Sequence, residues 1–289
     1  MIEKRLIAKP LIKKIYAELK EEIAAAESAP QLVIILIGAD PASEFYVSNL
    51  QKKGKKVGIN VTTKTYADDI SQAEILAEIE NLNQAQDVHG IMLQKPLPAQ
   101  LDESQIVMKI AADKDVDGFH PLNMGNLVLA RDGFIPSTPN AVLQILQYYQ
   151  IETNGKNVCV LGRSDIVGKP LANLLLRKDE TGNATVTICH SRTQDLAEHT
   201  RQADILIAAI GQPEFVKGDM IKPGAIVIDV GVNQIEDAEK GHRYVGDVDY
   251  EACFEKSKAI TPVPGGVGSV TTAMLLSNVL KAYKKCFLR

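Results

Sequence analysis

The 289-residue sequence contains no tryptophan, and only 5% of its residues are aromatic. It also lacks long apolar runs, because stretches such as 32–37 and 205–210 fall far short of the roughly 18 residues that a membrane-spanning helix needs. A charge excess of one sign is missing as well, since 32 basic and 36 acidic side chains leave a net charge of −4. General nucleic-acid binders carry a marked basic excess. We therefore expect that this chain binds neither a membrane nor nucleic acid.

Cysteine is scarce, and its spacing is uninformative about metals. Cys159, Cys189, Cys253 and Cys286 form no CxxC pair and show no spacing with histidine that is typical of zinc sites. We expect reduced thiols that lie mostly in the core, and no metal site. Residues 1–23 lack the apolar core and the small-residue cleavage site of a signal peptide, so we expect a cytoplasmic protein.

The residues that are present follow the ordinary composition of a globular protein, with 45% apolar and 24% charged. The length favours two domains. Apolar runs of strand length alternate with segments of helical period along the whole chain, which is typical of an α/β protein with parallel sheets. The predicted helices are 9–26, one from 41, one from 72 capped by Ser71, 103–111, 139–149, 170–177, 195–200 and 270–285; the predicted strands are 32–37, 59–66, 90–93, 158–161, 184–189, 205–210 and 225–230.

The domain boundary is predicted at the helix that follows Thr138 and Pro139, an N-cap residue and a proline at the first helical position. Residues 1–140 form the first domain, and the last helix, within 270–289, packs back on it. Residues 141–269 form the second domain, a compact nucleotide-binding set of parallel strands. We expect irregular chain over 117–136, which is rich in glycine, asparagine and proline.

A glycine turn at 162–168 separates a predicted buried strand from a helix. In that position backbone N–H groups and the helix N-terminus can face a pyrophosphate, as in Rossmann-type domains. Ser164 stands where the GxGxxG fingerprint has its second glycine, so an ordinary turn stays an alternative. The next strand ends in His190, Ser191 and Arg192 instead of the acidic residue of NAD-selective sites; with Arg163 they favour NADP, unless they are simply a solvated strand end.

Two further segments are candidate ligand sites. Residues 113–118 resemble the start of a calcium loop, but Met124 stands where that loop needs a glutamate. Asp117 fits better as a carboxylate that accepts two hydrogen bonds from an amidine-like ligand edge, with an Asx turn as the alternative. Residues 262–268 hold two prolines and three glycines, which favours a ligand-facing loop over a plain turn, with Ser269 as N-cap of the last helix.

Taken together, these residues resemble one family, the bifunctional methylenetetrahydrofolate dehydrogenase/cyclohydrolases of one-carbon metabolism. The resemblance covers nearly the whole chain and depends on several motifs in order. They are 38–47, 90–98, 114–121, 136–139, 162–170, 183–193, 229–233, 246–250 and 260–268.

The resemblance implies a two-domain enzyme, with a folate-binding catalytic domain and a Rossmann-type NADP domain, that oxidises 5,10-methylenetetrahydrofolate to the 5,10-methenyl form and then hydrolyses it to 10-formyltetrahydrofolate. It also implies a homodimer, a folate cleft between the domains, and a place in purine biosynthesis. Among catalytic and substrate residues, it implies that Tyr46 stacks on the pterin, Gln94 hydrogen-bonds the catalytic amine and Asp117 holds the amino-pyrimidine edge. The other implied positions are Gly162, Arg163, Ser164, Ser191 and Val232 for the cofactor and Pro264, Gly265 and Gly266 for the folate side.

One departure from the family pattern concerns the catalytic amine. The family has lysine four residues after the tyrosine, whereas this sequence has Leu50 four residues after Tyr46. Hydride transfer needs orientation more than a protein base, but hydrolysis needs a group that deprotonates water. We expect dehydrogenase activity with weak cyclohydrolase activity, unless Lys53 or Lys95 substitutes. The alternatives are a catalytically impaired cofactor-binding paralogue and a shikimate-type NADP dehydrogenase.

Overall fold

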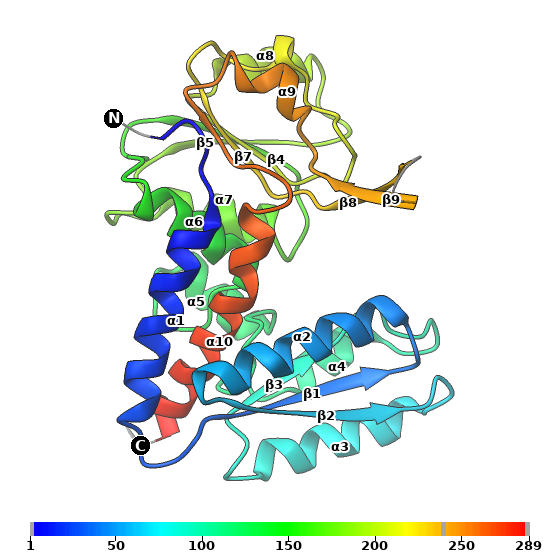
Figure 1. The fold of residues 1–289 in the computed structure, drawn as a ribbon. Coiled ribbons are helices and arrows are strands. Elements are labelled where there is room, and N and C mark those ends of the chain that lie inside the picture. The colour runs from blue at the N-terminus through cyan, green and yellow to red at the C-terminus, as the bar shows by residue number, and fades with distance from the viewer. Residues whose placement is uncertain (1–2, 238–240, 287–289) are drawn as a thin grey trace. The chain divides into compact units, whose positions relative to one another are not determined.

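The computed structural model describes residues 3–237 and 241–286 and confirms the predicted α/β class (Figure 1). The described chain divides into two compact units, each built on its own parallel sheet. The three-stranded unit comprises Lys14–Asn126, Arg131–Ile135 and the chain from Leu275 onward; the five-stranded unit comprises the chain up to Lys13, Leu127–Ala130 and Pro136–Met274. The domain boundary at residues 140 and 141 stays a prediction. Three helices have residues in both units: α1 (Ala8–Ala24), α5 (Pro121–Val128) and α10 (Val267–Cys286).

The three-stranded unit has strand order β2-β1-β3, all parallel. The central strand is almost wholly apolar, as expected of a strand buried on both faces. Val33, Ile35 and Ile37 point to the face that α3 and α4 cover, and α2 lies on the other face (Figure 1). The elements are β1 (Gln31–Ile37), α2 (Pro41–Val57), β2 (Asn60–Tyr66), α3 (Gln72–Gln84), β3 (Gly90–Leu93) and α4 (Glu103–Lys109).

The five-stranded unit has strand order β10-β7-β6-β4-β5, again all parallel. One face of this sheet packs its apolar side chains against α8 and α9, and α6 and α7 cover the other face (Figure 1). The elements are α6 (Ser137–Tyr148), β4 (Asn157–Leu161), α7 (Gly168–Leu176), β5 (Thr185–Cys189), α8 (Leu196–Gln202), β6 (Ile205–Ala208), the 3-10 turn η1 (Gly218–Met220), β7 (Ile226–Asp229), β8 (Asn233–Asp237), β9 (Gly241–Val245), α9 (Tyr250–Phe254) and β10 (Ala259–Ile260).

The structure corrects three local predictions and shows one strand pair that was not predicted. Helix α6 begins at Ser137 after Pro136, so Thr138 is not its N-cap, because the extended Pro136 already ends the loop there. Helix α10 begins at Val267, which places Ser269 inside the helix rather than at its cap. Part of the stretch expected to be irregular forms α5. The antiparallel pair β8 and β9 was not predicted.

The capping prediction at Ser71 is confirmed. Its hydroxyl accepts a hydrogen bond from the Glu74 N–H, and the Glu74 carboxylate accepts one from the Ser71 N–H, a reciprocal capping box. Of the four cysteines, Cys159, Cys189 and Cys253 are buried and Cys286 is exposed. Within residues 3–237 and 241–286, no helix combines the length and the apolar character that crossing a membrane would require.

Candidate functional site

Helix α2 carries the first group of predicted site residues. Asp40 caps its N-terminus by accepting a hydrogen bond from the Ser43 N–H at 2.8 Å, and Gly58 ends it in the left-handed conformation at φ 95°. Tyr46 and Lys53 lie half-buried on this helix, and burial lowers the pKa of Lys53. Leu50, between them, is 0% exposed. Position 50 therefore presents a packed apolar side chain.

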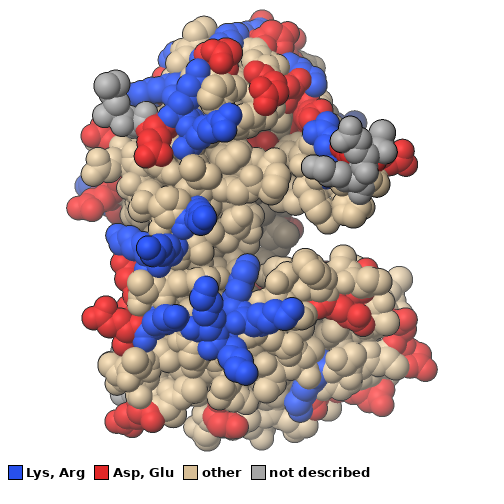
Figure 2. Space-filling model, viewed as in Figure 1, with Lys and Arg blue, Asp and Glu red and all other residues tan. Residues whose placement is uncertain are grey.

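Lysine side chains gather over α2 on the face shown in Figure 2. The last two turns of the helix hold Lys52, Lys53, Lys55 and Lys56, of which all but Lys53 are exposed. Positive charge at this end complements the partial negative charge of a helix C-terminus. The patch thus has a local structural reason, and Lys53 is its most buried member.

Gln94 follows β3 and is held by a fixed set of hydrogen bonds. Its Nε2 donates to the backbone oxygen of Lys95 at 2.7 Å and to the Ser43 hydroxyl at 3.3 Å, and that hydroxyl donates to the same oxygen at 3.3 Å. Because a carbonyl oxygen can only accept, this network fixes which end of the amide is nitrogen. The amide oxygen Oε1 is consequently buried with no hydrogen-bond partner among the described residues.

Asp117 lies beside the carboxyl end of β3. Burial, and to a lesser extent the charge of Asp115, raises its pKa to about 7, although the Lys95 charge and the Leu93 N–H act in the opposite direction. The Lys95 ammonium lies 4.8 Å from the ring centroid of Phe119 and 2.5 Å from a Glu103 carboxylate oxygen. A carboxylate that is poorly solvated in this way is prepared to accept hydrogen bonds from a ligand.

Asp115 has a structural task in the same loop. It is 2% exposed, and its carboxylate accepts hydrogen bonds from the N–H groups of Phe119 and His120 and from the side chain of Asn123. The acidic run that superficially resembles a calcium loop therefore uses Asp115 to fold the chain after Asp117.

The five-stranded unit contains a pocket of about 300 Å³ at the carboxyl ends of β4 and β5. The pocket is lined by four of the five positions that the sequence predicts for the cofactor: Gly162, Arg163, Ser164 and Ser191. The pocket also has apolar lining residues that sequence reasoning missed, since apolar residues after a strand carry no distinctive signal. These are Leu196, Ala209, Ile210 and Phe215.

Glycine is required at the turn that forms this pocket. A Cβ on Gly162 would lie 2.1 Å from the backbone oxygen of Ala209, and its φ of 130° is unfavourable for other residues. A Cβ on Gly168 would lie 2.2 Å from the oxygen of Gly162, so α7 packs directly on the turn. The Ser164 hydroxyl accepts hydrogen bonds from the N–H groups of Val167 and Gly168 and thus satisfies donors at the start of α7.

The turn after β5 is held in shape by its own residues. The Thr193 hydroxyl accepts a hydrogen bond from the His190 N–H at 2.9 Å, and His190 Nδ1 accepts one from the Arg192 N–H at 3.1 Å. Ser191 and Arg192 are exposed on this turn. No aspartate or glutamate of the described residues lines the pocket. This lining suits a phosphate better than it suits a bare ribose diol.

Val232 lies apart from the other predicted cofactor residues. It is 57% exposed and lines a second pocket, of about 200 Å³, with Tyr244 and the 262–269 loop. Pro264, Gly265 and Gly266 line the same pocket, so the structure groups Val232 with the predicted substrate loop.

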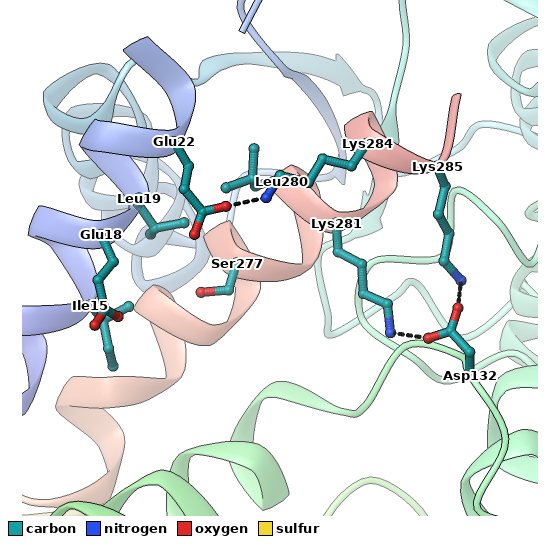
Figure 3. A pocket seen from close by; sticks show the side chains of 10 residues that line it. All are labelled: Ile15, Glu18, Leu19, Glu22, Asp132, Ser277, Leu280, Lys281, Lys284 and Lys285. Carbon is teal, nitrogen blue, oxygen red and sulfur yellow. Dashed lines mark hydrogen bonds and ion pairs between the residues drawn. The ribbon is translucent and has the colours of Figure 1, made fainter. Parts of the chain in front are cut away.

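A third hollow, of about 430 Å³, lies between α1 and α10 in the three-stranded unit (Figure 3). Asp132 there binds Lys281 at 2.5 Å and Lys285 at 2.7 Å, and Lys284 pairs with Glu22. These contacts hold the Asp132 pKa at about 2. The acidic side chains that line this hollow have basic partners: Asp132 and Glu22 pair with lysines of α10, and Glu18 pairs with Lys14.

Two family models match the chain. "Tetrahydrofolate dehydrogenase/cyclohydrolase, catalytic domain" matches residues 6–117, and "Tetrahydrofolate dehydrogenase/cyclohydrolase, NAD(P)-binding domain" matches residues 136–287. The chain is 51% identical over 285 residues to the bifunctional protein FolD of Chlorobium phaeobacteroides, covering 94% of this chain and 96% of the relative.

Solved structures agree with these matches. The FolD dehydrogenase/cyclohydrolase of Campylobacter jejuni is 44% identical with a TM-score of 0.91, covering 97% of this chain and 98% of that one. The Trypanosoma brucei enzyme, complexed with NADP cofactor and an inhibitor, is 37% identical with a TM-score of 0.91, covering 99% and 98%. The shikimate 5-dehydrogenase of Listeria monocytogenes, at 14% identity and a TM-score of 0.53, shares only the fold. The chain belongs to the tetrahydrofolate dehydrogenase/cyclohydrolase family.

Proposed function

We propose that this chain is an NADP-dependent dehydrogenase of 5,10-methylenetetrahydrofolate in which the following hydrolysis, to 10-formyltetrahydrofolate, is slow. The proposal that hydrolysis is slow depends on one observation: Gln94 Oε1 is buried without a hydrogen-bond partner among the described residues, and Leu50 is fully buried. The family resemblance assigns this glutamine the task of binding the catalytic amine. In this chain no amine is available at position 50.

The cofactor assignment follows from the family and from the fit of the pocket. NADP, when bound, supplies the hydride acceptor. The Gly162 turn lines the pocket and leads into the N-terminus of α7, a helix end that favours a pyrophosphate. Arg163 and Ser191, which line the pocket, offer a guanidinium group and a hydroxyl to the 2′-phosphate, and the exposed Arg192 follows Ser191 on the same turn. No aspartate or glutamate of the described residues, which would repel the phosphate, lines this pocket.

On the substrate side, Tyr46, Gln94 and Asp117 belong to the three-stranded unit. Asp117 holds the amino-pyrimidine edge of the pterin by accepting its N–H groups, and Tyr46 stacks on the ring. Gln94 Oε1 is free to accept a hydrogen bond from the ligand. Pro264, Gly265 and Gly266, which line the pocket of about 200 Å³ in the five-stranded unit, are the further substrate positions that the family resemblance implies.

The two reactions make different demands on these residues. Removal of hydride from the methylene carbon leaves an amidinium cation that its two nitrogens stabilise, so the residues mainly orient the reactants. Hydrolysis requires that a water lose its proton as it attacks that carbon, and a positioned base contributes about 10²- to 10⁴-fold. Leucine cannot act as that base.

Two lysines are candidates for a substitute base. Lys53 lies on the face of α2 that carries Tyr46, and burial lowers its pKa, which favours the neutral amine. The Lys95 side chain is already engaged in an ion pair with Glu103 at 2.5 Å. Lys53 is therefore the better candidate.

The experiment is the decay of methenyltetrahydrofolate supplied to the purified protein, measured above the rate in buffer. We expect little acceleration for the wild type. Family-level turnover that vanished in Lys53→Ala, but not in the exposed control Lys52→Ala, would show that hydrolysis is intact and depends on Lys53.

A second reading is a cofactor-binding paralogue that has lost catalysis, and Leu50 is the single feature that favours it. Reduction of NADP on addition of methylenetetrahydrofolate separates this reading from the enzyme. The shikimate-type alternative has no support beyond the shared fold.

We also propose a homodimer. Strand β5 is an edge of the five-stranded sheet, and Ile188 on it is 40% exposed, so the strand is available for pairing with a second copy. Sedimentation of Ile188→Lys as a monomer, with the wild type as a dimer, would support this interface. We further propose a cytoplasmic location and, from the family resemblance, a place in purine biosynthesis.

A further inference from the structure

Two buried carboxylates that have no role in the scheme above lie next to each other in the five-stranded unit. Asp229, at the end of β7, is 3% exposed, and Asp247, just after β9, is 0% exposed. The Asp229 carboxylate accepts hydrogen bonds from the N–H groups of Gly231 at 3.0 Å, Asp247 at 2.9 Å and Val248 at 2.9 Å. Asp229 thus fixes the backbone that carries Asp247.

The Asp247 carboxylate in turn joins two other segments. Its Oδ2 accepts hydrogen bonds from the N–H groups of Ile210 at 2.6 Å and Gly211 at 3.0 Å, and its Oδ1 accepts one from Asn233 Nδ2 at 2.9 Å. Ile210 lines the 300 Å³ pocket that contains the glycine turn. Val232, which precedes Asn233, lines the neighbouring 200 Å³ pocket. A single side chain therefore connects one wall of each pocket.

The surrounding chain is shaped around these two groups. A Cβ on Gly231 would lie 2.2 Å from Asp247 Oδ1, and a Cβ on Gly246 would lie 1.8 Å from Asp229 Oδ2. Neither carboxylate belongs to any of the ion pairs found within the described part of the chain. Both side chains are instead satisfied by N–H donors, so removal of one donor or acceptor would leave a buried polar group without a partner.

We propose that Asp247 is a positioning residue for NADP: by holding the backbone of Ile210 and Gly211 and the segment of Val232 and Asn233 at a fixed spacing, it sets the shape of the cofactor site. This inference depends on the NADP-dependent function proposed above. We do not place Asp247 in contact with the cofactor. It affects NADP binding through the groups to which it is hydrogen-bonded.

The test compares NADPH binding, followed by fluorescence titration, in three variants of the full chain. Asp247→Asn keeps the shape but replaces one acceptor oxygen with an NH₂ donor that must face other donors. Asn233→Ala removes one hydrogen bond from a half-buried residue and is the milder change. Thr153→Val is the control, since Thr153 is 3% exposed and loses only a buried hydrogen bond to the Gly182 oxygen, 2.7 Å long.

We expect Asp247→Asn to raise the NADPH dissociation constant about tenfold or more, because the Ile210 and Gly211 N–H groups or the Asn233 amide would lose their buried acceptor. Asn233→Ala should raise the NADPH dissociation constant less. Thr153→Val should lower the melting temperature but leave the NADPH dissociation constant unchanged. In steady state, Asp247→Asn should raise the KM for NADP while the kcat and the KM for methylenetetrahydrofolate stay near the wild-type values.

Equal NADPH affinity in the wild type, Asp247→Asn and Asn233→Ala would overturn the inference and leave the proposed function standing. Should Asp247→Asn fail to fold, Asn233→Ala decides: weaker NADPH binding with an unchanged kcat supports the inference, and unchanged binding overturns it. A wild-type protein that binds no NADPH would overturn both the proposed function and this inference.

Discussion

Gln94 donates its Nε2 hydrogen to the backbone oxygen of Lys95 at 2.7 Å, and this bond leaves Gln94 Oε1 buried without a partner among the described residues. An unmade hydrogen bond at a buried acceptor costs about 1 to 3 kcal/mol, so its persistence calls for an explanation. Under the proposed function, the missing donor is the lysine that the family resemblance leads us to expect at position 50. Leu50 therefore defines the first prediction.

Leu50→Lys should restore the hydrolytic step. We expect hydrolysis of methenyltetrahydrofolate to rise about 10²- to 10⁴-fold, because the variant regains a positioned base. Dehydrogenase activity should change little. Leu50→Met is the matched control, since it changes the shape of the same buried site without adding an amine. The prediction is wrong if the lysine variant hydrolyses methenyltetrahydrofolate no faster than the methionine variant.

The pKa of Asp117, raised to about 7, predicts a pH dependence for folate binding. The carboxylate form, which accepts the two pterin hydrogen bonds, predominates only above that pKa. The kcat/KM for methylenetetrahydrofolate should therefore rise with pH through about 7 and level off above it, whereas the profile for NADP binding should lack this limb. Asp117→Asn should lower kcat/KM and flatten the limb; a wild-type profile already flat between pH 6 and 8 would contradict the assignment.

Cofactor selectivity should depend on the turn after β5. We expect the exposed Arg192, which follows Ser191 on this turn, to contact the 2′-phosphate, so Arg192→Ala should lower the ratio of kcat/KM for NADP over NAD about 10- to 100-fold. Arg201→Ala, which removes an exposed arginine of α8 bound to the backbone oxygen of Asp219, should leave the ratio unchanged. Equal ratios in the wild type and in Arg192→Ala would show that this residue does not read the phosphate.

Gly162→Ala should damage both the fold and the cofactor site. The new methyl group would collide with the backbone oxygen of Ala209, and together with the φ of 130° we expect a loss of about 2 to 5 kcal/mol in unfolding free energy. Gly155→Ala is the control, because it also has a positive φ, 68°, but nothing lies within 4 Å of its Cβ. That variant should lose about 1 to 2 kcal/mol. Denaturant unfolding measures the loss of unfolding free energy in each variant. Similar losses in the two variants would show that the predicted collision does not occur.

Strands could be predicted from the sequence where their side chains are buried, because a buried strand leaves an apolar run. The strand 90–93 was predicted with its observed bounds, and the capping box at Ser71 was found from local chemistry alone. The pair β8 and β9 escaped prediction because neither strand contains an apolar run: their side chains are mostly exposed or half-buried. Thr138 and Ser269 are not caps because the helices begin two and three residues earlier than these cap-like residues indicate.

The site was predictable where chemistry and local spacing coincide. Gly162, Ser164 and Ser191 converge on one pocket, which follows from the rule that ligands bind at the carboxyl ends of parallel strands. The role of Asp247 had no local signal, because its partners at 210, 211 and 233 are distant in sequence and two of them are backbone groups. Only the folded chain brings them together.

The most direct test of the account follows both products when the purified protein receives NADP and methylenetetrahydrofolate in a single reaction. The account predicts that NADPH forms and that methenyltetrahydrofolate accumulates in nearly equal amount, because oxidation proceeds while hydrolysis does not keep pace. NADPH formation with 10-formyltetrahydrofolate as the main early product, or no NADPH at all, would contradict it.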